Sequence, residues 1–235
     1  ILVTTLFSIL LFSCNFDNFM PGVKGNGNVQ IEDRPVSQSF NTIKASQGLD
    51  VYLTQGSNEG IVVEADENLL EIIKTEIKDN ELRIYAKQNI GYASSKKITV
   101  TFEDIRAIAS SSGSDIKSTN TIIVNNLDLH ASSGSDMTLE IETNELSCST
   151  SSGSDLRLSG NTEKLIAEAS SGSDIKAGNL ISQSSQVRAT SGSDITVNTA
   201  KELTASANSG GDIRYYGNPS VVNKKDGPSG SIKKQ

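Results

Sequence analysis

The stretch Ser112-Gly113-Ser114-Asp115-Ile116 decides the fold, because it returns at nearly regular intervals through the second half of the chain. Its glycine recurs as Gly134, Gly153, Gly172 and Gly192, and a sixth copy, Ser209-Gly210-Gly211-Asp212-Ile213, has glycine in place of the second serine. The aspartates of the six copies are Asp115, Asp136, Asp155, Asp174, Asp194 and Asp212, which stand 21, 19, 19, 20 and 18 residues apart. A repeat of this length that tolerates small insertions is typical of a solenoid.

Small and apolar residues occupy alternate positions around the repeated glycine. Five residues before it stand Ile108, Leu129, Cys148, Ala167, Val187 and Ala205, and three residues after it stand Ile116, Met137, Leu156, Ile175, Ile195 and Ile213. Positions of this parity are predicted to point inward, including the serine directly before the glycine, such as Ser112. Positions of the other parity, which include the glycines, the aspartates and Lys117, are predicted to face solvent. An alternation of period two indicates strands.

Units of this kind can stack only in parallel, so we predict an all-β fold, a right-handed parallel β-helix with about 18–21 residues per coil. A leucine-rich repeat would need more leucines per unit, and a propeller blade would need about twice the length. With 235 residues, 5% aromatic content and no Trp, the chain suits one elongated domain with a thin core. The formal charge of −7 argues against a nucleic-acid partner, which would be bound mainly through Lys and Arg.

The residues before the repeats are predicted to form larger, irregular coils that cover one end of the solenoid. Within them, Gln47-Gly48-Leu49-Asp50-Val51 is predicted to be a degenerate first copy of the repeat. The predicted strands of this region are residues 49–55, 61–65, 74–77, 82–85 and 97–102. Residues 56–60 are predicted to form a hairpin or a coil corner, Asp79-Asn80 a turn, and Asp66 the cap of a short helix.

At the other end, residues 215–219 and Gly227-Pro228 are predicted to stop the regular repeat. The lysine pairs Lys224-Lys225 and Lys233-Lys234 would then lie in a solvated, frayed tail that blunts the edge.

The N-terminal residues predict where in the cell the protein is located. Residues 1–12 are apolar, too few for a membrane span of about 20 residues but suited to the core of a signal peptide. No initiator Met or basic segment precedes them, so we expect a truncated N-terminus. Leu11-Phe12-Ser13-Cys14 resembles a bacterial lipobox, which predicts lipidation of Cys14. We therefore predict a signal peptide at 1–14, a flexible tether at 15–28 and a β-helical domain at 29–235.

The alternative for this end of the chain is an ordinary secreted protein in which Cys14 and Cys148 form a disulfide. Cys148 falls in an inward column, however, where a free thiol behaves as a small buried hydrophobe. We therefore favour the lipoprotein.

The aspartate column allows several kinds of chemistry, because its carboxylates are expected about 4.8 Å apart in stacked coils. The simplest interpretation is structural: glycine permits the bend, while Ser and Asp side chains satisfy backbone groups at the corner. Further hypotheses are a Ca²⁺ ion bridging stacked carboxylates, a strip that binds glycans or another surface polymer, and a pair of carboxylates acting as in retaining glycosidases. The sole histidine, His130, is expected to be solvated, and no catalytic constellation is evident.

Several motifs resemble one bacterial family. They are residues 39–43, Gly48-Leu49-Asp50-Val51, residues 64–70, Asp79-Asn80-Glu81-Leu82, the serial Ser-Gly-Ser-Asp units and Tyr216-Gly217-Asn218-Pro219. Over about residues 25–235 the chain is similar to the head-GIN-domain family of "putative autotransporter adhesins". The resemblance implies a secreted or lipid-anchored bacterial protein with a β-helical fold and no established activity.

Together these observations predict a non-enzymatic lipoprotein of the cell envelope, placed at the outer membrane and either periplasmic or surface-exposed. Its expected partners are the membrane, through the lipid anchor, and a glycan, an envelope polymer or another protein. Two other functions stay open: a β-helical carbohydrate-active enzyme, and a scaffold that polymerises through the ends of the solenoid.

Overall fold

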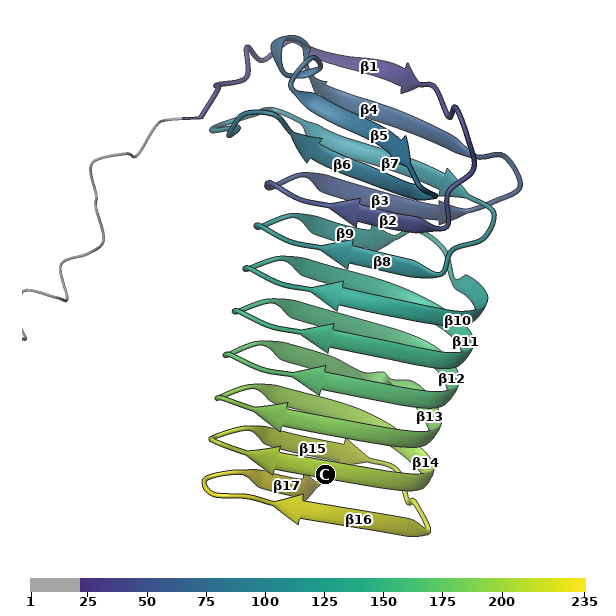
Figure 1. Cartoon of the computed structure of the whole chain (residues 1–235), viewed down its shortest axis with the longest axis vertical. Coiled ribbons are helices and arrows are strands. Elements are labelled where there is room, and N and C mark those ends of the chain that lie inside the picture. Colours follow the sequence, from purple (N-terminus) through teal and green to yellow (C-terminus); the bar gives the residue numbers. More distant parts are fainter. Residues whose placement is uncertain (1–21) are drawn as a thin grey trace, which may run out of the picture.

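The computed structural model describes residues 22–235, which form one elongated stack of strands (Figure 1). The regular part consists of β8 (Ala107–Ser110), β9 (Asp115–Ser118), β10 (Ile122–Ala131), β11 (Asp136–Thr150), β12 (Asp155–Ala169), β13 (Asp174–Thr190), β14 (Asp194–Asn208), β15 (Asp212–Tyr216), β16 (Val221–Asp226) and β17 (Ser231–Lys234). All pairings among these strands are parallel. The predicted parallel β-helix is confirmed.

One sequence repeat makes one coil. Asp136 pairs in register with Asp115 and with Asp155, and the same register continues through the later aspartates. The Ser-Gly-Ser-Asp corners therefore stack along one edge, on the left in Figure 1. At the opposite edge β11 to β14 bend without a break. We call the side that leads into the corners the β8 face, and the side that leaves them the β9 face.

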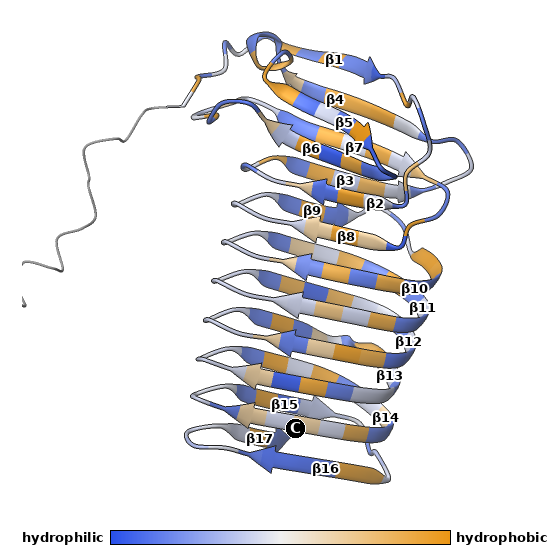
Figure 2. Cartoon of the chain, in the orientation of Figure 1, coloured by the Kyte–Doolittle hydropathy of each residue, from blue (hydrophilic) through white to orange (hydrophobic). Residues whose placement is uncertain are grey.

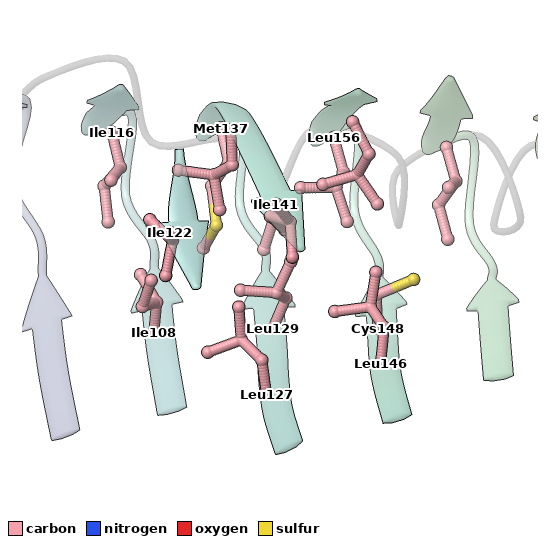
Figure 3. Packing of buried hydrophobic residues seen from close by; sticks show 14 of the residues in the cluster. Ile108, Ile116, Ile122, Leu127, Leu129, Met137, Ile141, Leu146, Cys148 and Leu156 are labelled. Carbon is pink, nitrogen blue, oxygen red and sulfur yellow. The ribbon is translucent and has the colours of Figure 1, made fainter. Parts of the chain in front are cut away.

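The core lies between these two faces. The column of Ile116, Met137, Leu156, Ile175, Ile195 and Ile213 is at most 1% exposed. Figure 3 shows Ile116, Met137 and Leu156 in a row, with Ile108, Leu129 and Cys148 of the β8 face across from them. Polar and apolar residues alternate along the strands, as Figure 2 shows. The predicted alternation is confirmed for these columns, and burial raises the pKa of the Cys148 thiol to about 12, which makes it unreactive.

The serine directly before each glycine does not point inward, and this part of the predicted alternation is wrong. These serines have φ values of 51° to 57°, and the glycines that follow have φ values of 68° to 77°. Two successive left-handed residues turn the chain by a tight bend, which interrupts the strand alternation. Ser112 and its equivalents are exposed as a result.

The head of the molecule continues both faces in a less regular way. On the β9 face, β3 (Asp50–Gln55) pairs in parallel with β7 (Lys96–Phe102), and β4 (Gly60–Asp66) and β1 (Val29–Arg34) follow antiparallel. On the β8 face, β2 (Thr42–Ala45) pairs in parallel with β6 (Glu81–Ala86), and β5 (Ile73–Lys78) follows antiparallel. Asp50 pairs with Asp115, which confirms the degenerate first copy.

Two details of the head differ from the prediction. Residues 56–60 join β3 to β4, but these strands do not form a hairpin because β7 lies between them. The predicted helix is a short 3₁₀ turn, η3 (Glu67–Leu69), and Asp66 makes no side-chain cap hydrogen bond to it. The predicted turn at Asp79-Asn80 is confirmed, with both residues at positive φ between β5 and β6.

The Asp66 carboxylate instead fastens the beginning of the described chain. Asp66 is fully buried and accepts backbone hydrogen bonds from Gly27 (2.5 Å), Ser94 (2.7 Å) and Ser95 (3.1 Å). Burial by itself raises the pKa of Asp66, but the hydrogen bonds from Ser95, Gly27 and Ser94 outweigh it and hold this pKa below its ordinary value.

The part of the expected tether that the structure describes, residues 22–28, makes contacts with the head. Val23 bridges Ile90, and Gly25 donates a backbone hydrogen bond of 2.8 Å to Tyr92. Residues 22–28 thus already contact the domain, although they precede its predicted boundary at residue 29. The predicted signal peptide and Cys14 lie outside the described residues.

The C-terminal residues form one more coil, so the prediction of a frayed tail is wrong. β16 pairs with β14, and β17 pairs with β15. Lys224 pairs with Ala205 of an inward column, and its ammonium group lies 4.7 Å from the centre of the Tyr215 ring. A lysine at an inward position covers the end of the core with charge, which discourages the pairing of further strands.

Candidate functional site

The corner edge is held together by a column of buried serines. They are the serines directly after the glycines, Ser114, Ser135, Ser154, Ser173 and Ser193, and all are fully buried. The Ser154 Oγ lies 2.9 Å from the carbonyl oxygens of both Ser151 and Ala131, and accepts a hydrogen bond from the Ser151 N–H. Ala131 belongs to the preceding coil, so each such hydroxyl joins two coils as well as closing its own corner.

In the sixth copy, close packing explains why Gly211 replaces the buried serine of the other copies. A Cβ atom at Gly211, which takes the place of the buried serine, would lie 2.5 Å from the backbone of Ala189. The backbone itself fills this site, and no side chain fits there.

The outward side of the edge presents Ser, Gly and Asp from every regular coil. The six aspartates are partly buried at the first position of their strands, and the serines and glycines of the bend before them are exposed. Apart from the glycine and its two chain neighbours, no residue lies within 4 Å of where a Cβ would stand at Gly113, Gly134, Gly153, Gly172 or Gly192. The structure thus brings the predicted aspartate column together as a periodic polar strip.

Basic side chains lie beside the aspartate column and form ion pairs with it. The sequence-based hypotheses considered only the carboxylates and did not include these pairs. Asp155 accepts from Arg157 at 2.7 Å and from Lys176 at 3.0 Å, and Lys176 also lies 3.1 Å from Asp174. Asp194 pairs with Arg214 at 3.5 Å. Each base stands two residues after an aspartate, on the same side of the strand. The sequence spacing could therefore have predicted these ion pairs. Acidic and basic side chains thus lie next to one another along this part of the edge.

A cation site is not evident at the strip. In the part of the chain that the structure describes, no group of three or more His, Cys, Asp or Glu side chains is placed to hold a metal ion. His130 is exposed, as expected, and its Nδ1 lies 2.6 Å from the Ser149 hydroxyl in the next coil. Within residues 22–235, no helix is long and apolar enough to cross a membrane.

The opposite edge contains a second column of buried hydroxyls that sequence analysis missed. Thr143 donates to the Asn125 carbonyl at 2.9 Å, and Ser182 donates to the Asn198 carbonyl at 3.0 Å, in each case across to a neighbouring coil. Both edges are therefore fixed by hydroxyl groups inside the coils, while the faces are held by apolar columns.

A cleft of about 520 Å³ lies on the β8 face of the head, beside the first corners. Its lining includes Lys44, Glu76, Glu81, Arg83 and Tyr85. Glu81 lies 2.6 Å from Lys44 and 2.5 Å from Arg83, and the Tyr85 hydroxyl donates to Glu76 at 2.9 Å. The hydrogen bond from Lys44, together with Arg83, holds the pKa of Glu81 below its ordinary value.

Glu81 is poorly suited to be the general acid of glycoside hydrolysis. A general acid must hold its proton near neutral pH, so its pKa has to be raised. The ion pairs of Glu81 have the opposite effect on its pKa. Its two ion pairs instead make Glu81 part of a fixed network of charges.

A family model described as "Putative auto-transporter adhesin, head GIN domain" matches residues 39–219. Among solved structures, a putative adhesin from Bacteroides fragilis has a TM-score of 0.85 and 22% identity, with 91% of this chain and 100% of that chain covered. A putative adhesin from Parabacteroides merdae has a TM-score of 0.73 and 21% identity, with 91% of this chain and 98% of that chain covered.

A putative lipid-binding protein from Parabacteroides distasonis has a TM-score of 0.70 and 20% identity, covering 91% and 99%. At these identities the likeness shows a common fold. A comparison with curated protein sequences finds no significant match.

Proposed function

Because the chain belongs to the head GIN domain family, described as putative auto-transporter adhesins, we propose that it is a non-enzymatic binding module of the bacterial cell envelope. The observation that carries this proposal is the periodic outer surface of the solenoid. Each coil presents the same Ser, Gly and Asp groups at the corner edge, one coil above the other. A surface of this kind suits a partner that is itself a repeating polymer, because successive coils can make equivalent contacts.

The charge pattern supports a binding function over an enzymatic one. Along the strip, Asp155, Asp174 and Asp194 are paired with bases, and all six aspartates occupy the same partly buried position at the start of a strand. An enzyme needs one pair of groups whose environments differ, as in glycosidases. The strip, with one aspartate in each coil, instead resembles a display surface.

Binding to envelope polymers tests this function. The purified protein is measured against immobilised peptidoglycan, lipopolysaccharide, neutral and acidic polysaccharides and extracellular matrix proteins. We expect saturable binding to at least one of them, weakened by simultaneous substitution of Asp155, Asp174 and Asp194 with Asn. Absence of saturable binding to every member of the panel would contradict the proposal.

A lipid anchor at Cys14 is the second part of the proposal. The apolar residues 1–12 and the lipobox-like Leu11-Phe12-Ser13-Cys14 support it. Each acyl CH₂ buried in a membrane contributes about 0.8 kcal/mol, so loss of the chains should detach the protein. We expect native protein in the membrane fraction of expressing bacteria and the Cys14→Ser variant in the soluble fraction. A Cys14→Ser variant that stays with the membranes would refute the anchor.

A further inference from the structure

A depression of about 470 Å³ lies on the β9 face towards the C-terminal end of the solenoid, away from the bend of the corners. It is lined by Lys176, Gly178, Asn179, Thr196, Asn198 and Tyr216, which come from the three neighbouring strands β13, β14 and β15. The other hollows that we describe contain no comparably exposed aromatic ring: Tyr216 is 44% exposed.

An irregularity in β13 creates the depression. The pairing of β13 with β14 runs from Ala177 opposite Val197 directly to Ile181 opposite Asn198, so the residues between, beginning with Gly178, form a bulge. Bulges of this kind redirect side chains and are frequent beside functional sites. The bulge turns Asn179 out to the solvent, where it is exposed.

Glycine at position 178 leaves the floor of the depression bare. A Cβ atom at Gly178 would lie 3.5 Å from Cε2 of Tyr216 and 3.4 Å from Cγ2 of Thr196, which are ordinary contact distances. The Tyr216 ring thus reaches across β14 to the bulge and forms one wall. Asn198 is held in place by a hydrogen bond of 3.4 Å from its Nδ2 to the Gly178 carbonyl oxygen.

We propose that this depression is a saccharide subsite in which one sugar ring packs on Tyr216 while its hydroxyl groups bind Asn179, Asn198 and Thr196. A pyranose has an apolar face of C–H groups and a rim of hydroxyls, and the exposed ring of a tyrosine offers matching apolar area. An amide side chain both donates and accepts hydrogen bonds, as sugar hydroxyls do. An apolar wall with a few convergent polar groups is the usual composition of a ligand site.

The charges around the subsite select a neutral sugar. Lys176 is the only cationic residue of the lining, and it is already engaged by Asp155 at 3.0 Å and by Asp174 at 3.1 Å. Asp155 also binds Arg157 at 2.7 Å, so the two carboxylates are balanced by two bases and the depression offers no free charge. A hexose or an N-acetylhexosamine needs no counter-charge in such a site, whereas the carboxylate of a uronic acid would find no free base to pair with.

This inference rests on the proposed binding function and adds a position and a ligand class to it. The test measures affinity for two neutral polysaccharides, dextran and mannan, and for alginate, a polyuronate, by affinity electrophoresis of the whole protein. We compare native protein with Tyr216→Ala, which removes the wall, and with Gly178→Leu, which fills the floor. Tyr92→Ala is the matched control, because Tyr92 is 70% exposed on the head. Melting temperatures near the native value verify that each variant is folded.

We expect native protein to bind dextran or mannan and not alginate, and both subsite variants to weaken this binding at least tenfold while Tyr92→Ala leaves it unchanged. Equal binding by native protein and both subsite variants would overturn the subsite and leave the general binding function standing. Binding to alginate or to a non-carbohydrate polymer alone would overturn it in the same way. Failure to bind any polymer of either panel would overturn both proposals.

Discussion

The Oγ atom of Ser154 lies 2.9 Å from the carbonyl oxygen of Ala131 in the preceding coil, inside a corner that water does not reach. The hydroxyl also accepts a hydrogen bond from the Ser151 N–H, so one small side chain satisfies groups of two coils. The corner sequence is therefore explained by two different needs. Glycine and the exposed serine allow the left-handed bend, and the second serine supplies the buried hydrogen bonds.

Removal of this hydroxyl should destabilise the solenoid. Ser154→Ala removes the hydroxyl that donates to the Ser151 carbonyl, and loss of a partner in this buried corner costs about 1–3 kcal/mol. The Ser151 N–H keeps its backbone hydrogen bond to the Ala131 carbonyl. For a domain of this size, each kcal/mol lowers the melting temperature by about 2–4 °C. Ser152→Ala, an exposed change in the same corner, should leave the melting temperature almost unaltered. Equal melting temperatures for the two variants would show that the buried hydroxyl contributes nothing.

The alternation of residues predicted the coils because every inward column repeats the same parity. It failed at Ser112, since two successive left-handed residues reset the direction of the side chains. The alternation correctly places the Ser154 side chain inside the coil, but it does not reveal which carbonyl oxygen a buried hydroxyl binds. In the head, β7 pairs with β3 and β4 over long sequence separations, and no local pattern encodes such an order.

The depression beside Tyr216 could not be predicted from the sequence, for a different reason. It depends on a bulge after Ala177, and on a ring that reaches from β15 across β14 to β13. Gly178-Asn179 interrupts the alternation, which is a weak signal for a bulge, but the partner two coils away appears only in three dimensions.

A charge placed inside the stack should be far more damaging than the loss of one outside. Ile175 is fully buried between Leu156 and Ile195, so Ile175→Asp puts an unpaired carboxylate in the apolar core. Lys176→Gln removes two half-exposed ion pairs, which are worth about 0–1 kcal/mol each. We expect Ile175→Asp to abolish the cooperative thermal transition and Lys176→Gln to lower its midpoint by a few degrees at most. Similar losses in both variants would mean that the assigned faces are wrong.

Titration of Asp66 should make the free energy of unfolding depend on pH under acidic conditions. The folded state holds the pKa of Asp66 below the unfolded value of about 3.9, so its contribution is fully present above that value. It is lost as the pH falls through the folded pKa, because the protonated group accepts the three N–H bonds poorly. Asp66→Asn lacks this titration.

The native protein should therefore melt well above the Asp66→Asn variant at pH 7, and the difference should shrink as the pH is lowered below about 4. Glu59→Gln serves as the control, since it removes a charge directly before the same strand and Glu59 contacts none of the three N–H donors. Circular dichroism at a series of pH values measures the difference. A constant difference between native protein and Asp66→Asn from pH 7 to pH 3 would contradict the assignment.

The last prediction concerns calcium at the corner edge. Asp155 and Asp174 share Lys176, and Asp155 also binds Arg157, so their negative charge is already balanced by bases that a divalent cation would have to displace. We therefore expect the melting temperature of the native protein to be the same with and without CaCl₂ at an ionic strength held constant with NaCl. Asp155→Asn combined with Asp174→Asn should change stability by about 1 kcal/mol or less, since partly exposed ion pairs contribute little. If the column did bind Ca²⁺, mass action would stabilise native protein by about 2.7 kcal/mol at a hundredfold excess over the dissociation constant, and the double variant would lose that gain. Such a calcium-dependent shift, present in native protein and absent from the double variant, would make the aspartate column a metal site rather than a row of ion-paired corners.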